Sequence, residues 1–365
     1  MKVLLFGGNG FIGGQTAAQL LELGADVVAV NRGRSWDWDK RDTLKPRLRC
    51  ITHNRKRPLL ECAELVRLLH EWGSADAVID FSGFDGRAVK QTAGALRDKT
   101  SLYVYISSDS VYEVCDKHHE GLTRETDAVR PDDPSIRRAL KKRDSYGHKK
   151  LQGEEELKEL RKSGSGPAYV ILRLADVIGP EDGTGRWWQL QLWLKLAHLM
   201  HIPVLPLSLK HRMLSLVYVK DVAAAVVDIL YMDTSRRMRI VDKEFNLAFC
   251  EPVTMEYLIC HIEKKLALDG ISDERIFDPS NNIPQIYPSV EKGPIDVTKA
   301  RAMLSWNPTS CEDAVSETVE FYESVAKSSG YVAEKNECIA EMLDDIEGLC
   351  DTNKAEQTLR NLLFR

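Results

Sequence analysis

The sequence predicts an α/β fold in which a doubly wound parallel sheet is followed by a smaller C-terminal lobe. Three observations predict it: strands that are unbroken apolar runs, helical periodicity between them, and a glycine-rich turn directly after the first strand. At 365 residues the chain can hold a large core. Its 29% of charged residues and net charge of −5 argue against a general polyanion binder.

The first fourteen residues carry the strongest local signal. Residues 3–6 form an apolar strand, glycines turn the chain, and an amphipathic helix follows over 15–23. A pyrophosphate needs free backbone N–H groups at a helix start, where the helix dipole also favours negative charge. Side chains at Gly7 or Gly10 would obstruct the turn or the phosphate, and one at Gly13 would push the helix off the strand. The pattern predicts a Rossmann-type dinucleotide site rather than a glycine-rich turn without a ligand. The expected cofactor contacts are Gly7, Gly10, Phe11, Ile12 and Gly13.

The end of the second strand indicates which dinucleotide binds. Strand residues 26–30 are followed by Asn31, Arg32 and Arg34, with no carboxylate where an acidic residue usually binds the adenosine ribose hydroxyls. A carboxylate would repel a 2′-phosphate, whereas an arginine would pair with it. We therefore expect NADP, with NAD as the second choice, and contacts from these three residues. The alternative is that both arginines face water.

The next strands and helices alternate as a doubly wound sheet requires. We expect strands at 50–52, 77–81, 102–106 and 168–172 and helices at 58–71, 87–96 and 146–160. The fourth strand ends in Phe81, Ser82 and Gly83, where the glycine either lets the backbone approach the cofactor or only forms a turn. The fifth strand ends in a polar cluster at 107–112, and ligands of such sheets bind at the carboxyl ends of strands.

The pattern beyond residue 175 predicts a second lobe and a tail. We expect strands at 216–219 and 245–247 and helices at 187–200, 221–231, 254–267, 310–326, 334–349 and 355–363. The dinucleotide-binding domain is expected to span 1–175, with 215–247 returning to it, the substrate-binding lobe 176–214 and 248–326, and a helical tail 327–365. Helix 187–200 is apolar nearly all round, which indicates burial or a subunit contact.

Tyr146 and Lys150 are the strongest catalytic candidates. They are four residues apart on a predicted helix and therefore share one face. A phenol is a poor base near neutral pH, but a neighbouring ammonium stabilises the phenolate and lowers its pKa. Ser108, at the end of the fifth strand, would bond the reacting oxygen and position it for proton transfer. Lys150 would also bond the nicotinamide ribose, and both Tyr146 and Lys150 are expected cofactor contacts.

With these pieces the chain resembles the extended short-chain dehydrogenases/reductases, the family of NAD(P)-dependent nucleotide-sugar epimerases, dehydratases and reductases. The matching stretches are 7–13, 106–112, Tyr146 with Lys150, 173–180, 217–223 and 296–308. The resemblance implies that Ser108, Tyr146 and Lys150 form the catalytic triad and that the second lobe holds the substrate. It also implies a homodimer through the helices before and at Tyr146.

Three departures from the family pattern bear on the substrate. Ser110 stands where the dehydratases carry the glutamate base, next to a retained Asp109, so dehydration is disfavoured. Asp176 stands near the position of an asparagine that touches the nucleotide diphosphate in epimerases, and its charge would repel that group. The acidic residue that usually contacts adenine after the third strand is missing, and Asn54 is expected to replace it.

Weaker candidates lie outside the triad. Arg186 and Trp187 would line the substrate pocket together with Asp109, Ser110 and Asp176, although an apolar core or dimer contact explains Trp187 equally well. His118 and His119 lack a third ligand at a useful spacing, so no metal is expected. A basic run at 137–143 is typical of a solvated helix face, and contact with an anionic substrate or RNA is the alternative.

The sequence thus predicts an NAD(P)-dependent oxidoreductase or epimerase that acts on a hydroxyl of a sugar-like small molecule, with nucleotide sugars as one class of such substrates. The alternatives are an RNA-binding or scaffold protein of the same fold that retains a bound cofactor, and a nucleotide-sugar dehydratase. Nucleic acid is the less favoured partner. The first strand leaves no room for a signal peptide, no apolar run is long enough to span a membrane, and eight scattered cysteines form no C-x-x-C pair. We therefore expect a cytoplasmic protein with free thiols.

Overall fold

Two compact units make up the chain. A computed structural model describes residues 1–33, 38, 40–268, 277–278 and 286–364. The first unit contains Met1–Ala175, Val219–Cys250 and Val290–Pro308, and the second contains Asp176–Tyr218, Glu251–Ser289 and Thr309–Arg365. Segment 290–308, which the sequence placed in the second lobe, therefore groups with the first unit. The C-terminal tail groups with the second unit.

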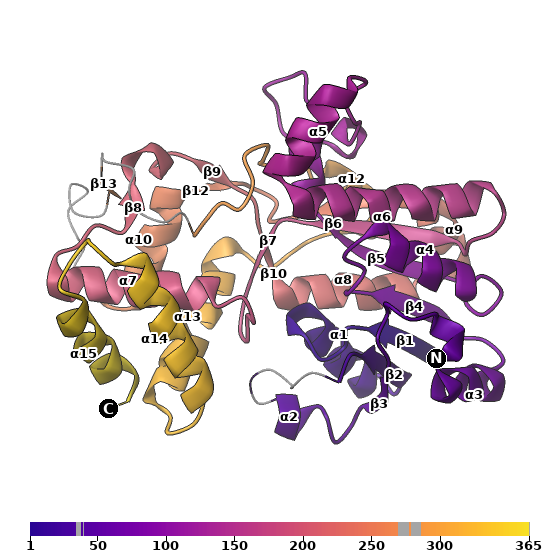
Figure 1. Ribbon diagram of the computed structural model, residues 1–365, viewed down its shortest axis with the longest axis horizontal. Helices are drawn as coiled ribbons and strands as arrows, with labels where there is room; N and C mark the ends of the chain where they lie inside the picture. Colours follow the sequence, from indigo (N-terminus) through magenta and orange to yellow (C-terminus); the bar gives the residue numbers. More distant parts are fainter. Residues whose placement is uncertain (34–37, 39, 269–276, 279–285, 365) are drawn as a thin grey trace. The chain divides into compact units, whose positions relative to one another are not determined.

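Seven parallel strands form the sheet of the first unit, in the order β11-β6-β5-β4-β1-β2-β3 (Figure 1). Their bounds are β1 Lys2–Phe6, β2 Asp26–Asn31, β3 Arg49–Thr52, β4 Ala77–Asp80, β5 Tyr103–Ser108, β6 Tyr169–Leu174 and β11 Lys243–Leu247. The strand order reverses direction at β1, which pairs with β2 on one side and with β4 on the other. Ligands of open α/β sheets bind at the carboxyl ends of the strands at such a point. The glycine-rich turn follows β1, so the topology places it there.

Helices cover both faces of this sheet. Helix α1 (Phe11–Glu22) lies on one face, where it packs against α8 (Val219–Tyr231) (Figure 1). On the other face α4 (Gly86–Ala95) packs against α6 (Ser145–Lys162). The remaining helices of this unit are α2 Lys40–Thr43, η1 Leu59–Glu61, α3 Ala63–Trp72, η2 Asp109–Val114, η3 Glu125–Asp127, α5 Pro134–Arg143, α9 Thr234–Ile240 and α12 Thr298–Leu304. Core residues under α3, α4 and α6 are fully buried, among them Leu4, Val78, Tyr105 and Leu157.

Helix α5 carries the basic run and has no buried residue. Asp133 caps its first turn through the N–H of Ser135, and Arg143 at its last turn donates to the backbone carbonyl of Glu113. A ten-residue helix is marginal in water without packing, so these polar anchors matter for its order. The structure places the basic run on a solvated helix.

The second unit is mainly helical. Among its described residues the helices are α7 Arg186–Met200, η4 Leu207–Leu209, α10 Met255–Lys265, α13 Cys311–Lys327, α14 Val332–Asp345 and α15 Thr352–Leu363. Its short strands pair as β7 (Asp176–Ile178) with β10 (Leu216–Tyr218), β9 (Met213–Leu214) with β12 (Val253–Thr254), and β8 (Leu205–Pro206) with β13 (Phe277–Asp278).

The tail helices α14 and α15 pack against α7 and help to bury it. Lys335 of α14 is buried, and its ammonium donates to the carbonyls of Ala326, Ser328 and Leu363. Lysine at the carboxyl ends of helices satisfies carbonyls that have no intrahelical partner, so Lys335 ties the tail to α13. In the described part of the chain, no helix combines the length and apolar character that a bilayer crossing requires.

Candidate active site

The glycine-rich turn is built so that β1 and α1 can approach each other closely. Gly7 has a φ of +92°, a conformation that residues with side chains rarely adopt. A Cβ on Gly13 would lie 2.2 Å from the carbonyl oxygen of Gly7, so no larger residue fits there. A Cβ on Gly10, by contrast, would meet only that same carbonyl within 4 Å. The space in front of Gly10 is therefore open to a ligand.

The first turn of α1 offers backbone donors to that space. Gly10 is the N-cap residue and provides no side-chain cap. The first N–H groups of a helix have no intrahelical partner, and they favour an anion. Phe11 and Ile12 are half-buried at this helix start. The residues present thus fit the pyrophosphate of a dinucleotide.

The second strand ends with an unpartnered polar atom. Asn31 is half-buried, and within the described residues no donor reaches its buried Oδ1 atom. A ribose hydroxyl would satisfy this oxygen. Arg32 is exposed, and Arg34 lies outside the described residues. Asn54 is exposed, and its Oδ1 accepts a hydrogen bond from the N–H of Lys56 in its own turn.

The loop after β4 connects the glycine-rich turn to α6. A Cβ on Gly7 would lie 3.2 Å from the Cβ of Ser82 and 3.3 Å from that of Phe81, so the two loops touch. The next residue, Gly83, is buried, and its carbonyl accepts hydrogen bonds from Tyr105 at 2.8 Å and from the Lys150 ammonium at 3.2 Å. These contacts place Lys150 next to the predicted cofactor loops.

Lys150 is a buried cation that points at the end of β5. It is 2% exposed, and its Nζ also donates to the carbonyl of Ile106 at 2.8 Å. Burial, opposed by the negative charges of Asp80 and Glu154, lowers the pKa of Lys150 to about 8. Lys150 can therefore lose its proton within the range in which enzymes work.

Tyr146 lies one turn before Lys150 on α6. Its side chain is 46% exposed, and the Lys150 Nζ lies 5.9 Å from the centre of its ring. Asp144 caps the helix through the N–H of Gly147 at 2.7 Å. The ring of Tyr146 thus has one side toward a charged amine and another toward solvent.

The start of α6 packs directly on the segment that follows Ser108. A Cβ on Gly147 would lie 2.0 Å from the carbonyl oxygen of Ser110, so the helix start needs glycine there. Ser108 is half-buried, and its Oγ accepts from the N–H of Ser110 and donates to Asp109 at 3.3 Å. Asp109 and Ser110 are buried. The structure therefore brings the helix of Tyr146 and the strand end of Ser108 into contact.

Two buried ion pairs lie near this site that the sequence did not predict. Arg55 binds both carboxylate oxygens of Asp80, at 2.6 and 2.7 Å, and also donates to Ser82 Oγ. Glu154 pairs with Arg173, and both side chains are fully buried. A signal for the second pair existed, because Glu154 extends the four-residue spacing of Tyr146 and Lys150 along α6. For Arg55 the sequence showed only a charged loop.

The remaining candidates lie in the second unit. Asp176 accepts hydrogen bonds from Arg186 at 2.7 Å and from the hydroxyl and N–H of Ser289 at 2.6 and 2.8 Å. Arg186 also lies over the ring of Tyr287, 5.1 Å from its centre. The charge of Asp176 is therefore balanced, which removes the sequence argument that it repels a diphosphate. Trp187 is fully buried and donates to Gln191, so the structure places it in the core.

His119 pairs with Asp127 at 3.0 Å in the first unit. Among the residues that the structure describes, no three His, Cys, Asp or Glu side chains are grouped so that they could hold a metal ion.

A sequence model described as the NAD dependent epimerase/dehydratase family matches residues 3–242. No curated protein matches the chain. Similar solved structures include UDP-glucose 4-epimerase from Thermotoga maritima with UDP-glucose, at 22% identity over 89% of this chain and 99% of that chain, with a TM-score of 0.64.

Two further structures show the same fold. UDP-glucuronic acid 4-epimerase from Bacillus cereus, with UDP-glucuronic acid and NAD, is 20% identical over 89% of this chain and 99% of that chain, with a TM-score of 0.64. dTDP-glucose 4,6-dehydratase from Bacillus anthracis, with NAD, is 16% identical over 89% and 97%, with a TM-score of 0.62. At these identities the likeness shows the fold.

Proposed function

The chain belongs to the NAD-dependent epimerase/dehydratase family, and from this premise we propose that it oxidises a hydroxyl group of a sugar-like substrate by hydride transfer. The observation that best supports the proposal is the position of Lys150. Its buried ammonium contacts the ring of Tyr146 and the carbonyl of Gly83, in the loop that touches the glycine-rich turn. At this position a positive charge can stabilise the phenolate of Tyr146, and the same ammonium can donate a hydrogen bond to the ribose of a cofactor.

Three side chains divide the chemistry in this proposal. The glycine-rich turn and the first turn of α1 would hold a nicotinamide dinucleotide, whose chemistry would be that of a reversible hydride acceptor. Tyr146 takes the proton of the substrate hydroxyl as the hydride leaves and gives it back on the return. Lys150 stabilises the phenolate form of Tyr146, and Ser108 donates to the substrate oxygen to hold it in place.

We propose a nucleotide sugar as the substrate class. Two of the similar structures hold UDP-linked sugars, and in this chain Arg186 neutralises the carboxylate of Asp176. The test is incubation with NAD or NADP and a panel of UDP- and dTDP-linked sugars, followed by chromatography and mass spectrometry. An epimer of unchanged mass supports the proposal. A product lighter by one water would instead establish a dehydratase, despite Ser110 at the position of the family's glutamate base. If no sugar in the panel turned over while the folded protein bound cofactor, the substrate class would be wrong.

NADP is the cofactor that the end of β2 favours. Asn31 offers an uncharged acceptor to a ribose hydroxyl, and Arg32 is exposed beside it. In Asn31→Asp the new carboxylate would repel a 2′-phosphate, so we expect the ratio of NADP to NAD affinity to fall by about tenfold, or ~1.4 kcal/mol. Calorimetric titration of both dinucleotides measures it, with Asn361→Asp, at an exposed position on α15, as the control. Tighter binding of NAD than NADP by the unaltered protein would end this preference.

Turnover is expected to fall as pH rises through about 8, the pKa to which burial lowers Lys150. Loss of the proton removes the charge that stabilises the phenolate of Tyr146. Stability should move the other way. Because the folded pKa lies below the ordinary value of 10.5, the unfolded chain binds more protons between the two values. The contribution of Lys150 to the free energy of unfolding therefore rises with pH across that window.

The profile of kcat/KM against pH tests the first effect, since it reports groups of the free enzyme. The second effect is measured by urea unfolding of the unaltered protein and of Lys150→Met at each pH. The difference between the two isolates the contribution of Lys150 to stability from that of tyrosines and cysteines that titrate in the same pH range. A kcat/KM that stays flat across the window would show that the charge of Lys150 is not needed.

A further inference from the structure

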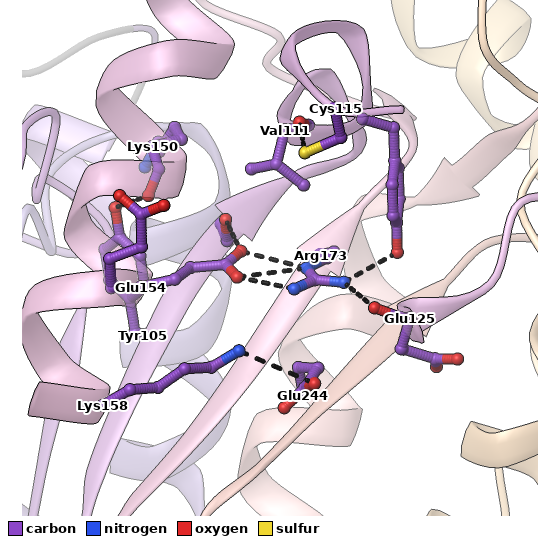
Figure 2. A network of polar contacts seen from close by, with 12 residues as sticks. Tyr105, Val111, Cys115, Glu125, Lys150, Glu154, Lys158, Arg173 and Glu244 are labelled. Atoms are coloured by element: carbon purple, nitrogen blue, oxygen red, sulfur yellow. Dashed lines mark hydrogen bonds and ion pairs between the residues drawn. The ribbon is translucent and has the colours of Figure 1, made fainter. Parts of the chain in front are cut away.

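A fully buried ion pair joins α6 to β6, and a serine hydroxyl extends it to the end of β5. Arg173 of β6 donates to Glu154 of α6 through Nε at 3.0 Å and through Nη2 at 2.7 Å, and neither side chain is exposed (Figure 2). Ser107 of β5 donates to the same carboxylate at 2.6 Å. Ser107 directly precedes Ser108, and Glu154 is four residues beyond Lys150.

The other side of the guanidinium holds different elements. Arg173 Nη1 donates to the hydroxyl of Tyr112 in η2 and to the carbonyl of Glu125 in η3, both at 2.9 Å. The Tyr112 hydroxyl in turn donates to Asn246 of β11 at 2.6 Å. The network is therefore divided by Arg173 into one side that reaches α6 and another that reaches η3 and β11.

A buried ion pair is a poor way to gain stability, because removing both ions from water offsets most of their attraction. It does impose geometry, since a shift of α6 along β5 would break the hydrogen bonds of Glu154 without offering water in exchange. Tyr146, Lys150 and Glu154 follow one another at intervals of one helical turn, so they share one face of α6. Fixing Glu154 against Ser107 thus fixes Tyr146 and Lys150 against the end of β5.

We propose that Ser107, Glu154 and Arg173 are positioning residues that set the distance between the alcohol of Ser108 and the phenol and amine on α6. All three side chains are buried, so the proposal has them act through Ser108, Tyr146 and Lys150 rather than on a ligand. The inference rests on the proposed function, because it assumes that these three groups act together. Misplacement of a reacting group by about 1 Å can cost about 100-fold in rate, so a small shift of α6 is sufficient to matter.

Two hydroxyl deletions in the same network separate positioning from stability. Ser107→Ala removes the hydrogen bond between β5 and α6. Tyr112→Phe removes two hydrogen bonds on the other side of Arg173, one from Arg173 and one to Asn246. Both variants leave the ion pair charge-balanced, and the control removes at least as many buried hydrogen bonds as the test variant. We expect Ser107→Ala to lower kcat about tenfold with the KM and the cofactor Kd within about twofold of the original values. We expect Tyr112→Phe to leave kcat within about twofold, and Ser107→Thr, which keeps a hydroxyl, to restore it.

Amide hydrogen exchange provides a readout that needs no substrate. The proposal predicts faster exchange in the first turns of α6 for Ser107→Ala and not for Tyr112→Phe. Equal losses of kcat in the two variants, or equal exchange, would show a merely structural network and overturn the proposal. An unchanged kcat in Ser107→Ala would overturn it as well. If Tyr146→Phe retained full turnover, the proposed function would fail while the exchange comparison still decided the positioning role.

Discussion

Tyr146→Phe should lower kcat by about 10²–10⁴, the usual contribution of a positioned general acid–base group. The variant loses only the hydroxyl, and the ring that lies 5.9 Å from the Lys150 ammonium stays in place. Because the side chain is 46% exposed, the change should leave the fold intact, and the dinucleotide affinity shows how much the lost hydroxyl contributes to cofactor binding. Steady-state kinetics on the substrate found in the panel, with cofactor titration by fluorescence, measures both quantities.

The chain offers a matched control in Tyr231, which is 49% exposed at the end of α8. Tyr231→Phe makes the same chemical change at a similar exposure and should leave kcat unaltered. Full turnover by Tyr146→Phe would mean that another group moves the proton. In that case Asp109, buried directly after Ser108, would be the next group to test.

Much of the fold could be predicted because its signals are local. The run from β1 through the glycine-rich turn to α1 combines an apolar strand, glycines and an amphipathic helix within 22 residues. β4 and β6 are fully buried along their length, as parallel strands covered on both faces should be, and their sequences are almost continuously apolar. Such features need no knowledge of distant residues.

The polar pairs could not be predicted because their partners are distant in sequence. Arg55 lies in a charged loop after β3, and nothing local shows that it pairs with Asp80 at the end of β4. The interpretation of Asp176 depended on the same missing information. A carboxylate alone suggests repulsion of a diphosphate, but Ser289, far along the chain, and Arg186 both bind it. Whether Asp176 repels a diphosphate therefore depends on neighbouring groups that only the fold brings to it.

The return of segment 290–308 to the first unit has a similar cause. Thr123 donates through its N–H to the carbonyl of Pro294, and Asp296 donates back to the carbonyl of Thr123. Asn246 of β11 reaches the carbonyls of Thr123 and Asp296 with its side-chain amide. These hydrogen bonds hold the segment beside β11. The segment has no apolar periodicity, so its sequence alone could not predict this position.

Asp80→Ala should destabilise the first unit by about 3–5 kcal/mol, the usual cost of leaving one member of a buried ion pair without its partner. Asp80 is fully buried and accepts both Arg55 bonds, the Tyr103 hydroxyl at 2.5 Å and the N–H of Ser82 at 3.1 Å. Burial alone would raise the pKa of Asp80, but the Arg55 guanidinium and the Tyr103 hydroxyl outweigh it and lower the pKa. The carboxylate is therefore charged at neutral pH, and its loss leaves the Arg55 charge in the interior.

Hydrogen exchange of the amides in β1, β4 and β5 measures this cost within the first unit, because core strands report its global opening. The matched variant is Arg55→Met combined with Asp80→Leu, which removes both charges and keeps the volume. Replacing both members of a buried pair by apolar groups is often neutral, so the double variant should recover most of the loss. It should still bind the dinucleotide more weakly, because Arg55 and Asp80 hold Ser82 in the loop that touches Gly7. A double variant less stable than Asp80→Ala would show that the ion pair stabilises the fold by its own attraction, against the argument that its main effect is to position the loop.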